Sequence, residues 1–222
     1  MLHKDWDAES KLDDILSEGV VRDVYEAEIA NELAEFIGKN ADVLNAHYPH
    51  LFGELQRMMT GWIFLAIARV FEERSPRSRY PIRSIAEALK ILEAGNVLIH
   101  SRAAAIRALN MEESEKKRLA EVSDDEFLKS TCLYFRERLS ALSTNIEMVK
   151  EKRDKVIAHR EAIDEAVVKR PKWDEIDDLI AFAKYFYEVV GKEIIGRHIE
   201  SDPARLTRSF KRLLTNASVT VS

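Results

Sequence analysis

Apolar residues recur at helical spacing along most of the chain. From residue 8 to residue 46 they follow a helical period, with Asp, Glu and Lys between them, as in an amphipathic helix that is either continuous or interrupted at Gly19 or Gly38. Residues 50–73 are apolar on nearly every side, which predicts a central, buried helix. Ser84 precedes Glu87 by three positions, and this capping-box spacing predicts a helix that starts at Ser84 and runs to about residue 92.

The helical pattern continues through the middle of the chain. Residues 97–109 are predicted to be helical, and the highly charged residues 111–121 form either a solvated helix or a loop. Ser123 and Glu126 make a second capping-box pattern. It opens the longest predicted helix, whose apolar stripe runs as far as Val149.

The last third of the chain completes an all-α pattern. Residues 160–172 are predicted to be a connection, residues 174–194 a strong helix, and residues 202–214 a short basic helix. With only seven Gly and five Pro in 222 residues, there is little room for the frequent turns of a β-sandwich. We therefore expect an all-α helical bundle in which residues 1–222 form one domain, with about 197–222 as a basic C-terminal appendage.

Composition and charge limit the classes of protein to which the chain can belong. The single cysteine, Cys132, excludes an intramolecular disulfide and is expected to be a core residue. No apolar run occurs in the first seven residues, and the longest apolar stretch, Trp62–Ala68, is too short for a membrane span. These features predict a soluble, cytoplasmic protein with no membrane partner. Its formal charge of −5 gives no general attraction to nucleic acid, so RNA binding would require a local basic patch.

Arg153 interrupts the apolar stripe of the longest predicted helix. After Ile146 and Val149, the same face places Arg153 where a core residue is expected. A buried guanidinium is costly unless it is paired or faces a polar cavity, and such breaks in a local rule often mark functional sites. The alternative is that the helix frays there and Arg153 lies on the surface.

His159 follows Arg153 by six residues, which is about 240° around an ideal helix. The two side chains therefore meet only if the helix bends or ends between them, or if a second copy of the chain completes the site. Histidine transfers protons near neutral pH, and arginine binds phosphate through parallel hydrogen bonds. The pair suits RNA cleavage by the neighbouring 2′-hydroxyl.

Two stretches of the chain resemble a known family. The sequence Arg-Asp-Lys-Val-Ile-Ala-His-Arg at residues 153–160 resembles the signature of HEPN domains, especially the type U branch linked to abortive infection and phage resistance. Residues 62–72 resemble the central apolar helix of that branch, which ends in an acidic residue and is followed by a loop and a short helix. The resemblance covers roughly residues 20–196.

The resemblance implies a homodimer and a metal-independent endoribonuclease of toxin or phage-defence type. By position, Arg153 and His159 would be the catalytic pair, and Asp154, where many members have asparagine, would orient one of them. RNA is the implied substrate, and a cognate antitoxin protein is a further expected partner. The sequence between His159 and Ala162 has no tyrosine for the nucleotide transfer that silences some relatives.

Basic residues near the pair and in the tail have two interpretations each. Lys152, Lys155 and Arg160 form either a phosphate-binding patch or an ordinary solvated helix end. The tail's basic residues form either a second RNA contact or, more commonly, a solvated face; they are Arg205, Arg208, Lys211 and Arg212. No glycine-rich phosphate loop or Cys/His metal spacing occurs, so neither a cofactor nor a metal is expected.

A second hypothesis is a non-catalytic helical module that binds a partner protein or nucleic acid, since some superfamily members lack nuclease activity. That hypothesis predicts a buried ion pair between Arg153 and a carboxylate, with His159 occluded or pointing elsewhere. The ribonuclease hypothesis predicts that Arg153 and His159 converge in an open polar cleft.

Overall fold

The structure is a computed structural model that describes residues 7–48, 50–74, 81–158 (backbone only for 156–158), 171–199 and 202–216. Every regular element within these ranges is a helix, which confirms the all-α fold class. None of the helices in the described ranges is both long and apolar enough to cross a membrane.

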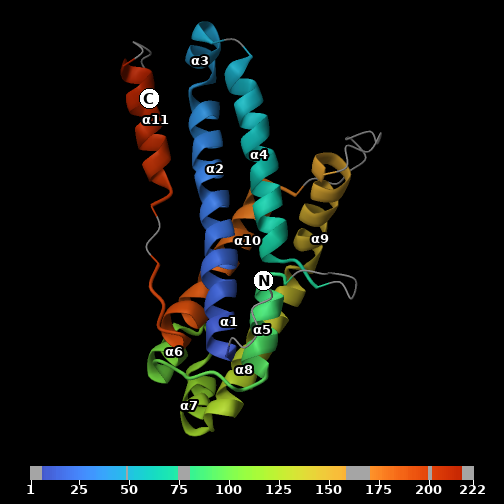
Figure 1. Ribbon diagram of the computed structural model, residues 1–222, viewed down its shortest axis with the longest axis vertical. Helices are drawn as coiled ribbons and strands as arrows, with labels where there is room; N and C mark the ends of the chain where they lie inside the picture. Colours follow the sequence, from blue (N-terminus) through green and yellow to red (C-terminus); the bar gives the residue numbers. More distant parts are fainter. Residues whose placement is uncertain (1–6, 49, 75–80, 159–170, 200–201, 217–222) are drawn as a thin grey trace.

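Two long antiparallel helical segments, here called rods, form the centre of the bundle (Figure 1). The first rod runs without a break through α1 (Ala8–Ile15), the π-helical η1 (Leu16–Val21) and α2 (Arg22–Lys39). It ends at Asn40, so the helix predicted over residues 8–46 is split, and α3 (Ala41–His47) is a separate turn. The second rod, α4 (Leu51–Val70), returns alongside α2.

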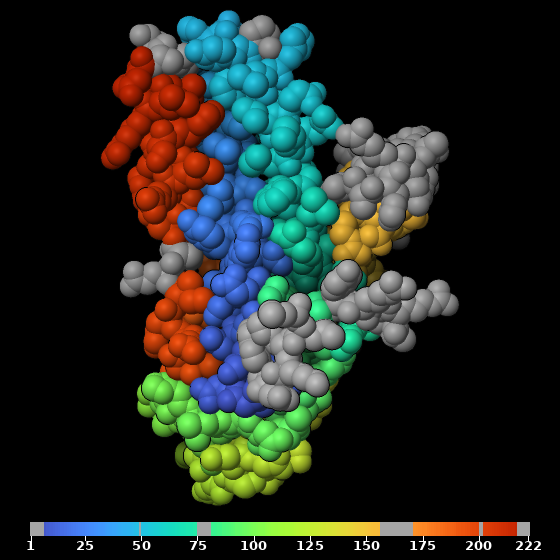
Figure 2. All heavy atoms as spheres, in the orientation of Figure 1, coloured from blue at the N-terminus to red at the C-terminus, as the bar shows by residue number. Residues whose placement is uncertain are grey.

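α4 is buried over only part of its length. From Ile63 to Val70 most of its side chains lie in the core, as predicted. Its N-terminal half differs from the prediction, because Leu51, Met58 and Trp62 are 51%, 59% and 45% exposed. Figure 2 shows this half of α4 at the surface beside α2. Part of the apolar surface of α4 therefore lies in the core, and another part, mainly in its N-terminal half, is exposed.

Four helices gather at one end of the rods: α5 (Ile85–Glu93), α6 (Arg102–Ala108), α7 (Glu113–Glu121) and α8 (Asp124–Ala141) (Figure 1). The Oγ atoms of the two predicted capping serines accept hydrogen bonds from the Glu87 and Glu126 amides at 3.4 and 3.3 Å. The helix predicted over residues 97–109 begins only at Arg102. The amides of His100 and Ser101 instead bond the carbonyls of residues 194 and 193, so this segment is held in a non-helical conformation.

The longest predicted helix is two helices. It bends at Leu142, whose φ of −93° and ψ of 0° leave the α-helical region, and α9 (Ser143–Lys152) begins immediately afterwards. α8 packs on α5, whereas α9 packs on α4. α9 then winds into a π-helical segment, η2 (Arg153–Ala158). Because of the bend, the apolar stripe packs on α5 through its first part, in α8, and on α4 through its second part, in α9.

The C-terminal helices close the bundle. α10 (Trp173–Phe186) packs on α2 and α4 from behind and continues as the π-helical η3 (Tyr187–Ile194) (Figure 1). α11 (Ala204–Asn216) lies along the other side of α2. It contributes Leu214 to a small second core cluster, separate from the main core, with Leu33, Phe36, Ile37, Leu44 and Phe52.

Cys132 is a core residue, as predicted. It is fully buried, and its Sγ lies 3.6 Å from the Leu89 carbonyl oxygen. Burial raises the pKa of the thiol to about 12, so Cys132 stays protonated at neutral pH and is a poor nucleophile.

Gly19 allows the chain to pass close to the first rod just before α5. A Cβ at Gly19 would lie 2.3 Å from Cβ and 2.6 Å from the carbonyl oxygen of Arg83. The side chain of Arg83 is anchored by Asp14, which accepts hydrogen bonds from Nε and Nη2 at 2.8 and 3.0 Å. The close approach therefore involves backbone that cannot move without breaking this anchor.

We expect Gly19→Ala to lower the free energy of unfolding by about 1–3 kcal/mol, because the added methyl overlaps the backbone of Arg83. Gly61→Ala in α4 is the matched control, since nothing lies within 4 Å of its added Cβ. That change should raise stability by about 0.5–1 kcal/mol, through helix propensity. Urea denaturation measures both. Equal effects for the two variants would contradict the close approach at Gly19.

Candidate active site

Arg153 lies at the junction of α9 and η2, and its side chain is 18% exposed. Its Nη1 donates a hydrogen bond to the carboxylate of Glu72, directly after α4. Its Nε donates to Oδ1 of Asp154 at 2.7 Å. The frayed, surface-exposed conformation considered from the sequence is therefore not what forms; Arg153 is largely buried and held on two sides.

The environment of Arg153 keeps it charged. Burial alone would lower the pKa of its guanidinium, but the hydrogen bonds to Asp154 and Glu72 outweigh this effect and raise the pKa. Nε and Nη1 are occupied by the two carboxylates, and in the described part of the chain Nη2 has no acceptor. A clamped guanidinium with one nitrogen still able to donate suits the binding of a single phosphate oxygen.

The helix changes its winding at Arg153. Residues 153–158 are π-helical, a form with wider turns than the α-helix that occurs frequently at functional sites. His159 and Arg160 lie outside the described residues, so their convergence with Arg153 stays a prediction.

The two flanking lysines occupy different environments. Lys152 is buried, at 8% exposure. Lys155 is half-buried, and its Nζ donates to Oε1 of Glu151 at 2.6 Å. Neither is an unengaged surface cation, and their role in RNA binding stays a prediction. In α11, Arg208 pairs with Asp202, and the ammonium of Lys211 lies 5.3 Å from the ring centre of Phe36.

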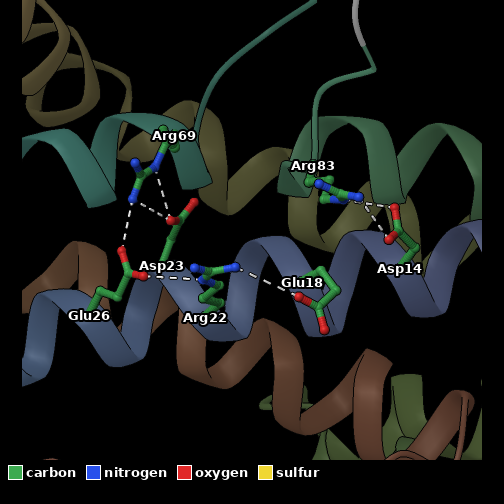
Figure 3. Close-up of polar contacts among 7 residues, drawn as sticks. All are labelled: Asp14, Glu18, Arg22, Asp23, Glu26, Arg69 and Arg83. Atoms are coloured by element: carbon green, nitrogen blue, oxygen red, sulfur yellow. Dashed lines mark hydrogen bonds and ion pairs between the residues drawn. The ribbon is translucent and has the colours of Figure 1, made fainter.

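A charge network fixes the end of α4 that carries Glu72 (Figure 3). Arg69 donates from Nε to Oδ1 of Asp23 at 2.9 Å and from Nη2 to Glu26 at 3.0 Å. Arg22 extends the network along the first rod, towards Glu26 at 3.2 Å and Glu18 at 3.8 Å. The last turn of α4 is therefore tied to α2, while the adjacent Glu72 is tied to η2.

Asp23 is the buried member of this network, at 8% exposure. Burial raises the pKa of its carboxyl, and the positive charge and hydrogen bond of Arg69 oppose that rise. Arg69 therefore favours the ionised form of Asp23 inside the bundle.

Glu72 was not assigned a role from the sequence alone. The sequence resemblance placed an acidic residue after the central helix, but nothing in the local pattern identified its partner, which lies 81 residues away. Asp154, the expected supporting residue, does contact Arg153. Among the described residues, no group of three or more His, Cys, Asp or Glu side chains is placed to hold a metal ion.

A groove of about 410 Å³ is lined by Lys150, which precedes Arg153 by three residues. The groove lies between the end of α4, the start of α5 and the bend between α8 and α9, and Glu73 is also among its lining residues. The candidate site is thus a clamped arginine beside an open hollow.

An all-α bundle is the fold that the resemblance to HEPN domains implied. The family model HEPN_AbiU2, described as AbiU2, matches residues 10–217, so this chain belongs to the AbiU2 family of HEPN domains. The resemblance seen in the sequence is thereby confirmed. Comparisons with curated proteins and with solved structures gave no match.

We expect Arg69→Met to lower the free energy of unfolding by about 1–2 kcal/mol at pH 7, because Asp23 loses its main counter-charge. This is less than a fully buried pair would lose, since Arg69 is 47% exposed. Arg22→Met is the matched control: Arg22 is 63% exposed and should cost less than about 0.5 kcal/mol.

The cost of Arg69→Met should shrink as the pH falls from 7 towards 4. The folded-state pKa of Asp23 is raised, so its contribution to stability is greatest below the unfolded pKa and is lost as the pH rises. Without Arg69 that pKa rises further, and protonation relieves the buried charge. Urea denaturation of both variants across this pH range measures the trend, and a constant difference would show that Asp23 does not depend on Arg69.

Proposed function

We propose that this AbiU2-family chain is a metal-independent endoribonuclease that acts in the cytoplasm as a phage-defence effector. The observation that carries the proposal is the clamped guanidinium of Arg153, which keeps its charge and offers Nη2 to a ligand. Preorganised donors aimed at developing charge are among the strongest catalytic devices. A phosphodiester in RNA develops such charge on its non-bridging oxygens during cleavage.

The chemistry assigns a role to each member of the pair. His159 removes the proton of the 2′-hydroxyl, whose oxygen attacks phosphorus. The bond to the 5′-oxygen breaks, that oxygen takes up a proton from a general acid, and a 2′,3′-cyclic phosphate remains. Arg153 stabilises the charge on the phosphoryl oxygens. Asp154 and Glu72 position Arg153 rather than touching the substrate.

The same ion pair also favours the second candidate, a non-catalytic interaction module. That hypothesis predicts a buried pair between Arg153 and a carboxylate, and the Arg153–Glu72 contact has this form. The two functions differ in what Arg153 is needed for. In the ribonuclease it acts on RNA; in the module it holds η2 against α4.

Arg153→Ala and His159→Ala should each lower the rate of RNA cleavage about 100-fold or more, and Arg57→Ala should leave it unchanged. Arg57 is the control because it is exposed and, among the described residues, its ion-pair partner is Glu54 within α4 itself. The measurement is cleavage of a labelled structured RNA in EDTA, with analysis of the product ends. Absence of cleavage by folded wild-type protein against several RNAs would favour the interaction module.

A homodimer is part of the proposal, and an apolar row on α4 supports it. The row consists of Leu51, Leu55, Met58, Trp62 and Leu65, with alternating spacings of four and three. This is the spacing of the seam between two paired helices. Leu51, Met58 and Trp62 are exposed, and Leu55 and Leu65 are half-buried. Leu55 packs on the smaller core cluster and the Arg69 guanidinium lies 5.9 Å from the centre of the Trp62 ring, so the row is only partly covered within the described chain. A second copy of this chain would cover it.

Met58→Glu should shift the protein from dimer to monomer, because Met58 is 59% exposed at the centre of the row and a buried unpaired carboxylate is costly. Leu98→Glu is the control, since Leu98 is 78% exposed but lies outside the row. Sedimentation equilibrium measures the mass of both variants. If Met58→Glu keeps the wild-type mass, the row is not the interface.

A further inference from the structure

The groove beside Arg153, here called the α9 groove, has the size and lining of a ligand site. Its volume of about 410 Å³ falls within the usual range for small-molecule sites. Leu139 and Ile146, both half-buried, contribute apolar surface, and Ser140 and Ser143 contribute hydroxyl groups on either side of the bend at Leu142. The bend that separates α8 from α9 therefore also shapes the hollow.

Two charged side chains on the α9 groove, Glu147 and Lys150, form no ion pair or hydrogen bond within the described part of the chain. Arg136, which also lines the groove, differs: its Nε and Nη2 donate to the carboxylate of Glu93 at 2.6 and 2.7 Å, and the charge of Glu73 also acts on it and raises its pKa. The available charges are thus one carboxylate and one ammonium, which suits a ligand that carries both an anion and hydrogen-bond donors.

The order of these side chains along α9 gives the groove a direction. Ser143, Glu147 and Lys150 follow one another at spacings of four and three, which places them on one helix face, and Arg153 follows after three more residues. The cation therefore lies at the end nearest Arg153, and the carboxylate and hydroxyl lie farther away. A nucleotide has the matching polarity, with a phosphate at one end and the base edge at the other.

We propose that the α9 groove binds the nucleotide next to the scissile phosphate and selects bases that carry an exocyclic amino group, such as cytosine. This inference rests on the proposed ribonuclease, which places the scissile phosphate at Arg153. Lys150 binds the neighbouring phosphate. Glu147 accepts a hydrogen bond from the amino group. Uracil presents a carbonyl oxygen at the same position and is repelled by a carboxylate.

Cytidine and uridine 5′-monophosphates are the sharpest probes, because their bases differ only at position 4, which is amino in cytosine and carbonyl in uracil, and at N3, which carries a hydrogen in uracil. Titration of the full-length protein in EDTA, followed by NMR, should show cytidine monophosphate binding about three- to tenfold more tightly than uridine monophosphate. Glu147→Gln should abolish the difference, since an amide both donates and accepts. Lys150→Gln should weaken both nucleotides alike. Glu137→Gln changes an exposed glutamate outside the groove and should leave both affinities unchanged.

Equal affinity of the wild type for both nucleotides, a preference that survives Glu147→Gln, or no saturable binding of either would overturn the proposal. These results are independent of RNA cleavage. Nucleotide preference without cleavage would reject the ribonuclease and leave the groove as a nucleotide site. Cleavage without nucleotide preference would support the ribonuclease and reject the α9 groove as its base-selecting subsite.

Discussion

The contact between Glu72 and Arg153 joins the two parts of the molecule on which the site depends. A guanidinium that is 18% exposed is tolerated only because carboxylates meet it. Glu72 supplies one carboxylate from the end of α4, and Asp154 supplies another from η2 itself. Three residues before Glu72, Arg69 holds the same end of α4 to α2. The position of Arg153 is therefore set by the packing of the two long rods, not by its own helix alone.

Most of the chain's positive charge near the site is already engaged, and this limits what an acidic protein can bind. Lys155 pairs with Glu151, Arg136 pairs with Glu93, and Arg69 pairs with Asp23. Lys150 differs, because it forms no ion pair within the described residues. An anionic ligand would therefore meet few available cations, arranged in sequence along α9, rather than a broad basic surface. Such an arrangement favours recognition of a defined segment over general attraction to nucleic acid.

The sequence predicted the positions of the helices better than the bends and breaks between them. Ser84 and Ser123 identified two helix starts because capping is local chemistry. The bend at Leu142 was missed because this leucine is in phase with the apolar stripe, and no Gly or Pro marks the break. Arg153 was correctly singled out as a polar residue on an apolar face. Its partner could not be inferred, since a contact between positions 72 and 153 depends on tertiary packing.

The presence of two hydrophobic clusters affects how cooperatively the bundle unfolds. The smaller cluster joins α2, α3, α4 and α11 at the far end of the rods, whereas the main core surrounds the end that carries Glu72. Met59 packs against both clusters, and regions that share little packing open with separate free energies. We therefore expect α11 to detach, exposing Phe36 and Phe52, at a lower free energy than the end of α4 that holds Arg153. The bundle would then have two local folding units along one pair of helices, coupled through Met59.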